Sequence, residues 1–318
     1  MSRCVSTIYP ASPTSPFTSF PGSSALGGGE IHQAKILLLT SHSGYAILSE
    51  KMGQFMTGFT DEDLEDLRFA KQILENPGIT AKLTYFIGIP IEKGIELLPE
   101  KWSETIRDAT RKALIVALNG ALLTLDKRIQ APAQNVWHKV AVAVSGAGGG
   151  ALGLPALIVE LPVSTTLMLR SIADIARSEG EQLHLTASKL ACMEVFALGG
   201  RSSKDDSAES GYFTVRAALA KAVSEAAEFI AERGLAREGA PAIIRLTTQI
   251  AERFGVTVSE KMVAQAVPAI GAIGGAMINL VFIDHFQDMA RGHFTVRRLE
   301  RKYGAEAVKT AYLKLANK

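Results

Sequence analysis

Two acids and two imidazoles lie close together in the C-terminal part of the sequence, which contains Asp284, His285, Asp288 and His293. Asp284 and Asp288 are four residues apart and share one face of a helix, and a hard or borderline cation accepts carboxylate and imidazole ligands. However, His285 points about 100° away from Asp284 on a helix. His293 lies beyond Gly292, and no HExxH motif is present. The spacing therefore predicts no metal site.

A single acid interrupts the first long apolar part of the chain. Glu160 is the only charged residue between Lys139 and Arg170. It could be a carboxylate of raised pKa in a cavity, acting as a general acid or base or as a proton-sensitive switch. Alternatively, it pairs with Arg170 or favours the N-terminus of a helix. We favour the second interpretation, in which Glu160 has a structural role as an ion-pair partner or at a helix N-terminus.

Other polar residues extend this candidate site. Arg170 and Asp174 have i,i+4 spacing and Asp174 and Arg177 have i,i+3 spacing, which predicts a ladder of ion pairs; a phosphate-binding face on the two arginines is the alternative. Asn279, inside the second apolar run, is predicted to anchor helices by a hydrogen bond. The full candidate polar site, in or beside the apolar core, comprises Glu160, Arg170, Asp174, Asn279, Asp284, His285 and Asp288.

Motifs of the common catalytic mechanisms are missing from the sequence. There is no GxSxG, and Ser145 in VSGAGGG has no identifiable His/Asp partner. The glycine-rich SGAGGGALG lacks the GxxxxGK[ST] pattern of a phosphate loop. Cys4 and Cys192 lie far apart and outside any CxxC motif, and Cys192 is predicted to be a small buried apolar residue. The sequence identifies no catalytic residue and no cofactor.

A basic cluster follows the second apolar run. It gives a local charge of +4, with Glu300 as its one acid, and consists of Arg291, Arg297, Arg298, Arg301 and Lys302. Such a cluster would be attracted to anionic lipid by about 1 kcal/mol per basic residue, or it could have intramolecular partners such as the acidic run 61–66. The whole chain of 318 residues carries a net charge of only +2, which excludes nucleic-acid binding through bulk charge.

Two uncharged stretches, residues 140–159 and 262–283, must position these groups. Both reach membrane-spanning length, but glycine, proline and polar residues weaken the insertion signal of each. We therefore favour a glycine-rich helical pair buried in a bundle, with insertion as the alternative. Small residues spaced for close helix packing are Gly146, Gly149, Gly150, Gly153, Gly271, Gly274 and Gly275.

Helical spacing dominates the rest of the chain, and no segment alternates with period two for long enough to indicate a sheet. Helices are expected to begin at Thr60, Pro99, Pro132, Pro162 and Thr186. Later helices are expected over 212–233, 240–253, 259–289, 295–303 and 305–316. The predicted fold class is all-α, a compact multi-helix bundle with the two glycine-rich apolar segments at its centre.

Composition divides the chain into three parts. Residues 1–29 are rich in Ser, Pro and Gly and are predicted to be a disordered tail. Residues 30–59 form an N-terminal extension of uncertain role, for which a helix is one alternative. Residues 60–318 are predicted to be a single helical domain. The tail has no apolar region typical of a secretory signal, and we expect no signal peptide.

Three sequence segments resemble the EcsC family. They are LPVSTTLMLRSIADIARSEGE (161–181), the later segment 266–304 ending FTVRRLERKYG, and the upstream ENPGITAKLTYFIGIPIEKGIELLPEKW (75–102). The resemblance covers roughly residues 60–305. It implies a helical, glycine-rich, bacterial-type protein working near a membrane, and it implies no reaction, cofactor or catalytic set. Because the family is named after a member encoded beside an ABC exporter, it also suggests an ABC transporter as partner.

We therefore expect a cytoplasmic, non-enzymatic regulatory or scaffold factor that associates peripherally with the inner face of the membrane. Its partner would be the membrane surface or an integral membrane protein, and not a nucleic acid. The alternative is a hydrolase, or a lipid-binding or lipid-modifying protein, with a pocket between the apolar helices and Glu160, Asp284 and His285 at its polar mouth.

Overall fold

A computed structural model describes residues 58–75, 79–88, 91–96, 100–125, 154–200, 211–234, 240–265 and 271–315. These residues belong to one compact unit, Gly58–Lys318. The described part of the chain contains helices and no strand, which confirms the predicted all-α class. The helices are α3 (Asp61–Glu75), α4 (Ile79–Ile87), α5 (Ile91–Glu96), α6 (Glu100–Thr124), α8 (Leu154–Ser178), α9 (Thr186–Leu198), α10 (Gly211–Arg233), α11 (Pro241–Gln265), α12 (Gly271–Tyr303) and α13 (Ala305–Lys314).

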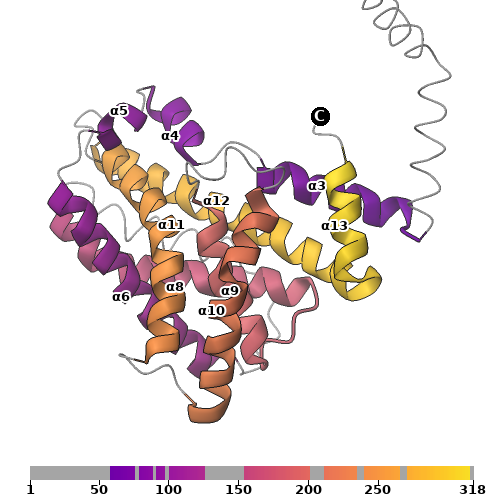
Figure 1. Cartoon of the computed structure of the whole chain (residues 1–318). Coiled ribbons are helices and arrows are strands. Elements are labelled where there is room, and N and C mark those ends of the chain that lie inside the picture. Colours follow the sequence, from indigo (N-terminus) through magenta and orange to yellow (C-terminus); the bar gives the residue numbers. More distant parts are fainter. Residues whose placement is uncertain are drawn as a thin grey trace, which may run out of the picture. The chain divides into compact units, whose positions relative to one another are not determined.

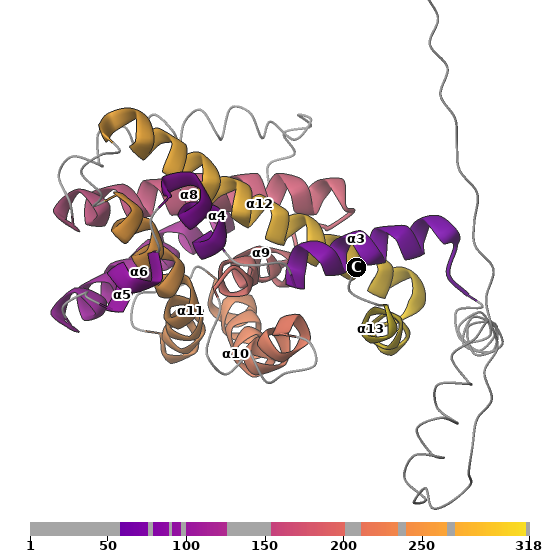
Figure 2. The same ribbon diagram turned by 90° about the horizontal axis from the view of Figure 1, so that it is seen from above.

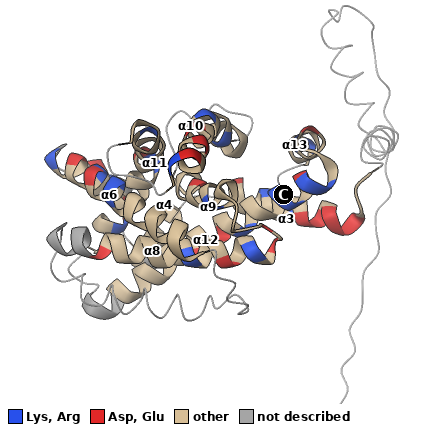
Figure 3. Cartoon of the chain, turned by 90° about the horizontal axis from the view of Figure 1, so that it is seen from below, with Lys and Arg blue, Asp and Glu red and all other residues tan. Residues whose placement is uncertain are grey.

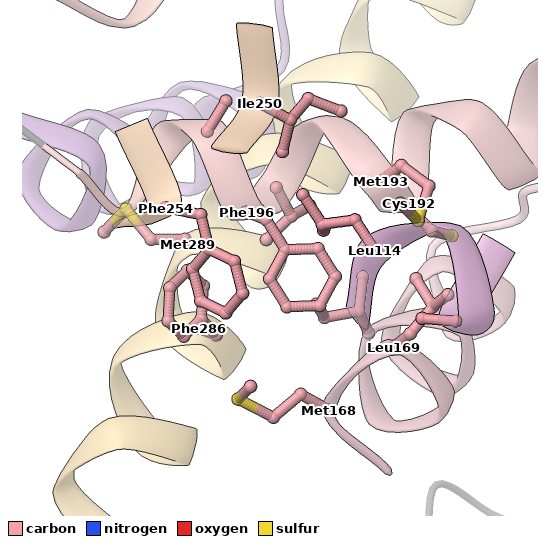
Figure 4. Close-up of a cluster of buried hydrophobic side chains, with 14 of the residues drawn as sticks. Leu114, Met168, Leu169, Cys192, Met193, Phe196, Ile250, Phe254, Phe286 and Met289 are labelled. Carbon is pink, nitrogen blue, oxygen red and sulfur yellow. The ribbon is translucent and has the colours of Figure 1, made fainter. Parts of the chain in front are cut away.

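The short helix α9 forms the centre of the bundle. Ten of its thirteen residues are buried, because its sequence TASKLACMEVFAL offers apolar side chains on nearly every side. Helices α6, α8, α10, α11 and α12 all pack against it. Phe196 of α9 lies beside Phe254 of α11 and Phe286 of α12 (Figure 4). Cys192 is fully buried on the same helix, as predicted.

The long helix α12 joins the two ends of the bundle. Its 33 residues span about 50 Å; it contacts α4 near its middle, where Asp288 pairs with Lys82, and α3 and α13 towards its C-terminal end (Figure 1). Helix α8 lies alongside it (Figure 2). Residues 271–283 of α12 are uncharged, and the later turns carry all of its acids, histidines and arginines. The apolar and the charged halves of one helix thus meet different neighbours.

Several predicted helix boundaries are wrong. The predicted helix 259–289 is divided between α11 and α12, and the sequence between them contains Pro268, which cannot donate a backbone hydrogen bond. The predicted break near Gly292 does not occur, because this glycine is buried inside α12 against Leu74 of α3. Helix α8 starts at Leu154 and contains Pro162, which sequence analysis placed at the helix start.

The predicted start of α3 and the predicted division between the last two helices at residue 304 are confirmed. The hydroxyl of Thr60 accepts the backbone N–H of Asp63 at 3.2 Å, which caps α3. Gly180 follows α8 and Gly304 separates α12 from α13, with φ values of 81° and 88° that favour glycine.

Several predictions lie outside the described residues. These are the tail, the extension up to residue 57, the helix expected at Pro132 and most of the first uncharged stretch, including Gly146, Gly149, Gly150 and Gly153. Gly271, Gly274 and Gly275 lie in the first turns of α12. Among the helices that the structure describes, none combines the length and the apolar character needed to cross a bilayer.

Candidate functional site

A polar network is buried where α9, α10 and α12 meet. The ring of His293, on α12, is fully buried. Its Nδ1 lies 3.1 Å from the hydroxyl of Tyr212 on α10, and its Nε2 lies 3.8 Å from Oε2 of Glu194 on α9. We call these three residues, with Arg216 and Glu300, the Glu194 network.

Arg216 closes the network on its outer side. Its guanidinium donates two hydrogen bonds to the carboxylate of Glu300, at 2.7 and 3.0 Å, and a third to the Tyr212 hydroxyl at 3.2 Å. This forked geometry fixes both partners, because guanidinium and carboxylate match as planar groups. Arg216 of α10 and Glu300 of α12 therefore join the two helices, and the Tyr212 hydroxyl links this ion pair to His293.

Burial gives the titratable groups of this network unusual proton affinities. It raises the pKa of Glu194 to about 7, although the nearby Arg216 and Arg297 oppose the effect. It lowers the pKa of His293 well below the ordinary value, and both arginines add to this shift. Perturbed carboxyl and imidazole groups in one cluster are typical of functional sites. The network is accordingly a candidate site, and sequence reasoning missed Glu194, Tyr212 and Arg216.

A second carboxylate lies next to this network. Glu181 accepts hydrogen bonds from Arg297 at 2.9 and 3.3 Å and from Ser188 at 2.7 Å, and Arg301 also pairs with it. Burial by itself would raise the pKa of Glu181, but the bonds from Arg297 and Ser188 outweigh burial and the pKa lies below its ordinary value. An ionised carboxylate is therefore held between the start of α9 and α12.

Each residue of the basic cluster has an intramolecular carboxylate partner. Arg298 pairs with Asp63, Asp66 and Glu179, and Lys302 pairs with Asp63. The alternative of partners in the acidic run 61–66 thus describes these two residues. Figure 3 shows the blue and red ribbon segments gathered where α3 meets α12. Contact of the cluster with an anionic membrane stays a prediction.

The remaining cluster residues, Arg291, Arg297 and Arg301, also have carboxylate partners, and that of Arg301 is Glu181. Arg291 donates to Asp288 at 2.8 Å, and Asp288 also pairs with Lys82 of α4 at 3.0 Å. Arg297 holds Glu181.

The structure brings two of the predicted site residues together in the apolar half of the bundle. Oε1 of Glu160 accepts hydrogen bonds from Nζ of Lys261 at 2.8 Å and from Nδ2 of Asn279 at 3.2 Å. Lys261 is fully buried, and burial lowers its pKa despite the paired carboxylate. Its ammonium also lies 4.9 Å from the ring centroid of Phe282. Three helices, α8, α11 and α12, are joined by this one group.

The other predicted residues go to different places. His285 bonds through Nε2 to the carbonyl of Gly199 at 2.8 Å, and burial lowers its pKa to about 4. Asp174 pairs with Arg177 at 2.8 Å, whereas Arg170 is exposed on the same helix. Glu160 and His285 therefore have separate partners, and the polar mouth of the hydrolase alternative stays a prediction. Among the residues described, no group of three or more His, Cys, Asp or Glu side chains could hold a metal.

An exposed apolar strip lies along the contact between α6 and α8. Gly120 of α6 faces the side chain of Thr166 on α8. One turn to either side lie Val116, Leu123 and Val163, which are 53, 59 and 54% exposed. We call these three residues the α6–α8 seam. Single exposed apolar residues are ordinary, but these three lie on the faces of α6 and α8 on which Gly120 and Thr166 meet.

The fold and the site define a class: an all-helical bundle whose buried charges are held in internal networks. A model of the EcsC protein family matches residues 62–299, and the chain belongs to this family. The match starts in α3 and ends in α12. It includes the Glu160 group, the Glu194 network except Glu300, and the Glu181 group except Arg301. No curated protein and no solved structure matches the chain.

Proposed function

We propose that the protein is a non-enzymatic regulatory or scaffold factor that associates peripherally with the inner, cytoplasmic face of an anionic membrane through the α6–α8 seam. The observation that carries this proposal is the exposure of Val116, Leu123 and Val163. Such a surface fits the headgroup boundary of a bilayer, where aliphatic side chains leave water without crossing the membrane.

Charge at the seam favours an anionic lipid surface over a neutral one. The C-terminal half of α6, residues 113–124, has no charged residue. Lys112 lies one turn before Val116, and Arg170 lies one turn beyond Thr166 of α8; both side chains are exposed. Two cations beside an apolar strip match the negative potential of acidic lipids.

The expected binding is weak and reversible. Three aliphatic side chains that already lie partly buried contribute about 1 kcal/mol each, and the two cations contribute about 1 kcal/mol each. A total of about 5 kcal/mol corresponds to a dissociation constant of a few tenths of a millimolar. Stable residence at a membrane would need a second contact, and an integral membrane protein such as an ABC transporter is the partner that the family suggests.

The test is sedimentation of the full chain with vesicles of phosphatidylcholine, with or without about one third phosphatidylserine. We expect pelleting with the anionic vesicles only. It should weaken as salt rises, because salt screens exposed charges. Leu123→Glu combined with Val163→Glu should reduce pelleting at least about tenfold, because each change puts a charge into the apolar layer.

The matched control is Val256→Glu combined with Leu313→Glu, which adds the same two negative charges at exposed apolar residues of α11 and α13. The control should bind like the wild type. The proposal is wrong if the seam variant pellets as well as the control, or if the protein pellets with native membranes but never with protein-free vesicles. The second result would identify a membrane protein, and not lipid, as the partner.

A further inference from the structure

The Glu194 network contains a donor and an acceptor that face each other without touching. Nε2 of His293 is fully buried and has no hydrogen-bond partner among the described residues. The nearest carboxylate oxygen, Oε2 of Glu194, is 3.8 Å away, which exceeds hydrogen-bond range by well under 1 Å. A buried polar nitrogen without a partner is costly and needs an explanation.

The other bonds of the network decide where the imidazole hydrogen lies. Arg216 can only donate, so the Tyr212 oxygen accepts its N–H. The Tyr212 hydroxyl is then oriented to donate to Nδ1 of His293. A neutral imidazole that accepts at Nδ1 carries its hydrogen on Nε2. The hydrogen of His293 therefore points at Glu194.

The carboxyl group of Glu194 can exchange protons with solvent, because a tenth of this side chain is exposed. The charged groups that act on it are Arg216 from α10 and Arg297 and Glu300 from α12. Both arginines are already held by other carboxylates, Glu300 and Glu181. They favour ionisation of Glu194 without binding it.

Charged side chains of the other helices around α9 have partners of their own. Arg177 of α8 pairs with Asp174, and Arg253 of α11 donates to the carbonyl of Gly200. Lys189 of α9 donates to the carbonyl of Leu122 on α6. The state of Glu194 is thus set by burial, by Arg216, Arg297 and Glu300, and by the neighbouring ring of His293.

We propose that Glu194 and His293 form a proton-operated latch between α9 and α12. When Glu194 is ionised, its carboxylate moves onto the Nε2–H of His293 and a charge-assisted hydrogen bond fastens the two helices. When Glu194 takes up a proton from solvent, the attraction falls and the latch opens to the separation of 3.8 Å. Throughout, His293 stays neutral, and only Glu194 gains or loses a proton.

The pKa of Glu194, about 7, places this change in the neutral range. The ring of His293 does not itself titrate in this range, because its own pKa lies well below the ordinary value. A change in its signal near pH 7 would therefore report the state of Glu194. The latch does not depend on membrane binding, so the two proposals fail separately.

The test is nitrogen-15 NMR of the histidine side chains of the full chain from pH 5.5 to 8.5. We expect the Nε2 resonance of His293 to keep the shift of a protonated, neutral-ring nitrogen and to move with a midpoint near pH 7, following Glu194. In Glu194→Gln, which mimics the protonated acid, this movement should disappear. Glu306→Gln, an exposed acid on α13, is the control and should leave it unchanged.

Two results would overturn the latch. One is conversion of His293 to imidazolium between pH 5.5 and 8.5, and the other is a resonance that does not move or moves equally in Glu194→Gln. Hydrogen exchange of the α9 amides supplies a second reading. After correction for intrinsic rates, protection should rise about tenfold from pH 6 to pH 8 in the wild type and in Glu306→Gln but not in Glu194→Gln. Equal protection in all three proteins would contradict the proposal.

Discussion

At the scale of single residues, the buried histidine His285 makes the fold sensitive to acid. Its pKa is about 4 in the folded chain and 6.5 in the unfolded one. Its stabilising contribution is therefore complete above pH 6.5 and is lost as the pH falls towards 4. The full shift corresponds to about 3 kcal/mol.

The corresponding variant is His285→Gln, which keeps a donor for the Gly199 carbonyl but cannot take up a proton. We expect urea unfolding to show less loss of stability between pH 6.5 and 4.5 than in the wild type. His184→Gln, at an exposed loop position between α8 and α9, is the control and should follow the wild-type profile. An unchanged acid limb in His285→Gln would mean that this ring is not the source of the sensitivity.

The sequence pattern predicted Glu160 and Asn279 as polar residues in or beside the core but missed Lys261 and Glu194. Glu160 stands out as the only charge between Lys139 and Arg170, and Asn279 as a polar residue within an apolar run; the structure joins them. Lys261 lies in SEKMVAQ, which is typical of a solvated surface, so its burial depends on the position of α8 and α12. Glu194 does interrupt the apolar sequence LACMEVFAL, and the same signal would have found it.

At the scale of elements, Gly292 sets how closely α3 approaches α12. A Cβ at this position would lie 2.7 Å from Cγ of Leu74 and 3.2 Å from the carbonyl oxygen of Ala70. We expect Gly292→Ala to destabilise the protein by about 1–3 kcal/mol, because overpacking outweighs the gain in helix propensity.

The matched control is Gly255→Ala in the interior of α11, where an added Cβ meets nothing within 4 Å. There only propensity acts, and stability should rise by about 0.5–1 kcal/mol. Adding Leu74→Ala to Gly292→Ala should recover part of the loss, which a double-mutant cycle by urea unfolding would measure. Strictly additive losses would show that the two side chains do not meet.

Asp63 fastens the first turn of α3 to the last turns of α12. Its carboxylate accepts hydrogen bonds from Thr60 at 2.8 Å and Lys302 at 2.6 Å, and also from Tyr303. The bonds from Lys302 and Tyr303 hold the pKa of Asp63 well below its ordinary value. The stabilising contribution is therefore present above that value, 3.8, and is lost as the pH falls below it.

We expect Asp63→Asn to lower the free energy of unfolding by about 1–3 kcal/mol at neutral pH, because charge-assisted hydrogen bonds are lost. Asp61→Asn removes an exposed acid from the same turn and should change it by less than about 0.5 kcal/mol. Equal effects of the two variants in denaturant unfolding would show that the general charge of the first turn matters, and not this contact.

Helix existence was largely predictable from the sequence, whereas several helix boundaries were not. Capping at Thr60 and the glycines after α8 and α12 act locally, so a local pattern finds them. Pro162 and Gly292 are ordinary breakers that tertiary packing keeps inside helices. Packing neighbours decide whether such a residue breaks its helix. For Gly292 this neighbour is Leu74, which lies more than two hundred residues away in the sequence.

At the scale of the whole molecule, the described core contacts all lie between Gly58 and Lys318. We expect a chain that begins at Gly58 to unfold cooperatively, with a midpoint within about 2 °C of the full chain, because no described core side chain is removed. Calorimetry of the two chains checks this. As a control, a chain that begins at Ile79 removes α3 and should lose several degrees, since Leu67 and Ala70 are fully buried. A lower midpoint for the Gly58 chain would show that the preceding residues stabilise the fold.

The contact between α3 and the end of α12 also imposes an order on biosynthesis. Asp63 and Lys302 are 239 residues apart, so α3 leaves the ribosome long before its partner exists. At about 5–20 residues per second, the delay is roughly 12–48 s. During that time the apolar face of α3 that carries Leu67 and Ala70 has no native cover. A growing chain of this protein therefore presents a site for general chaperones that closes only after the end of α12 has been synthesised.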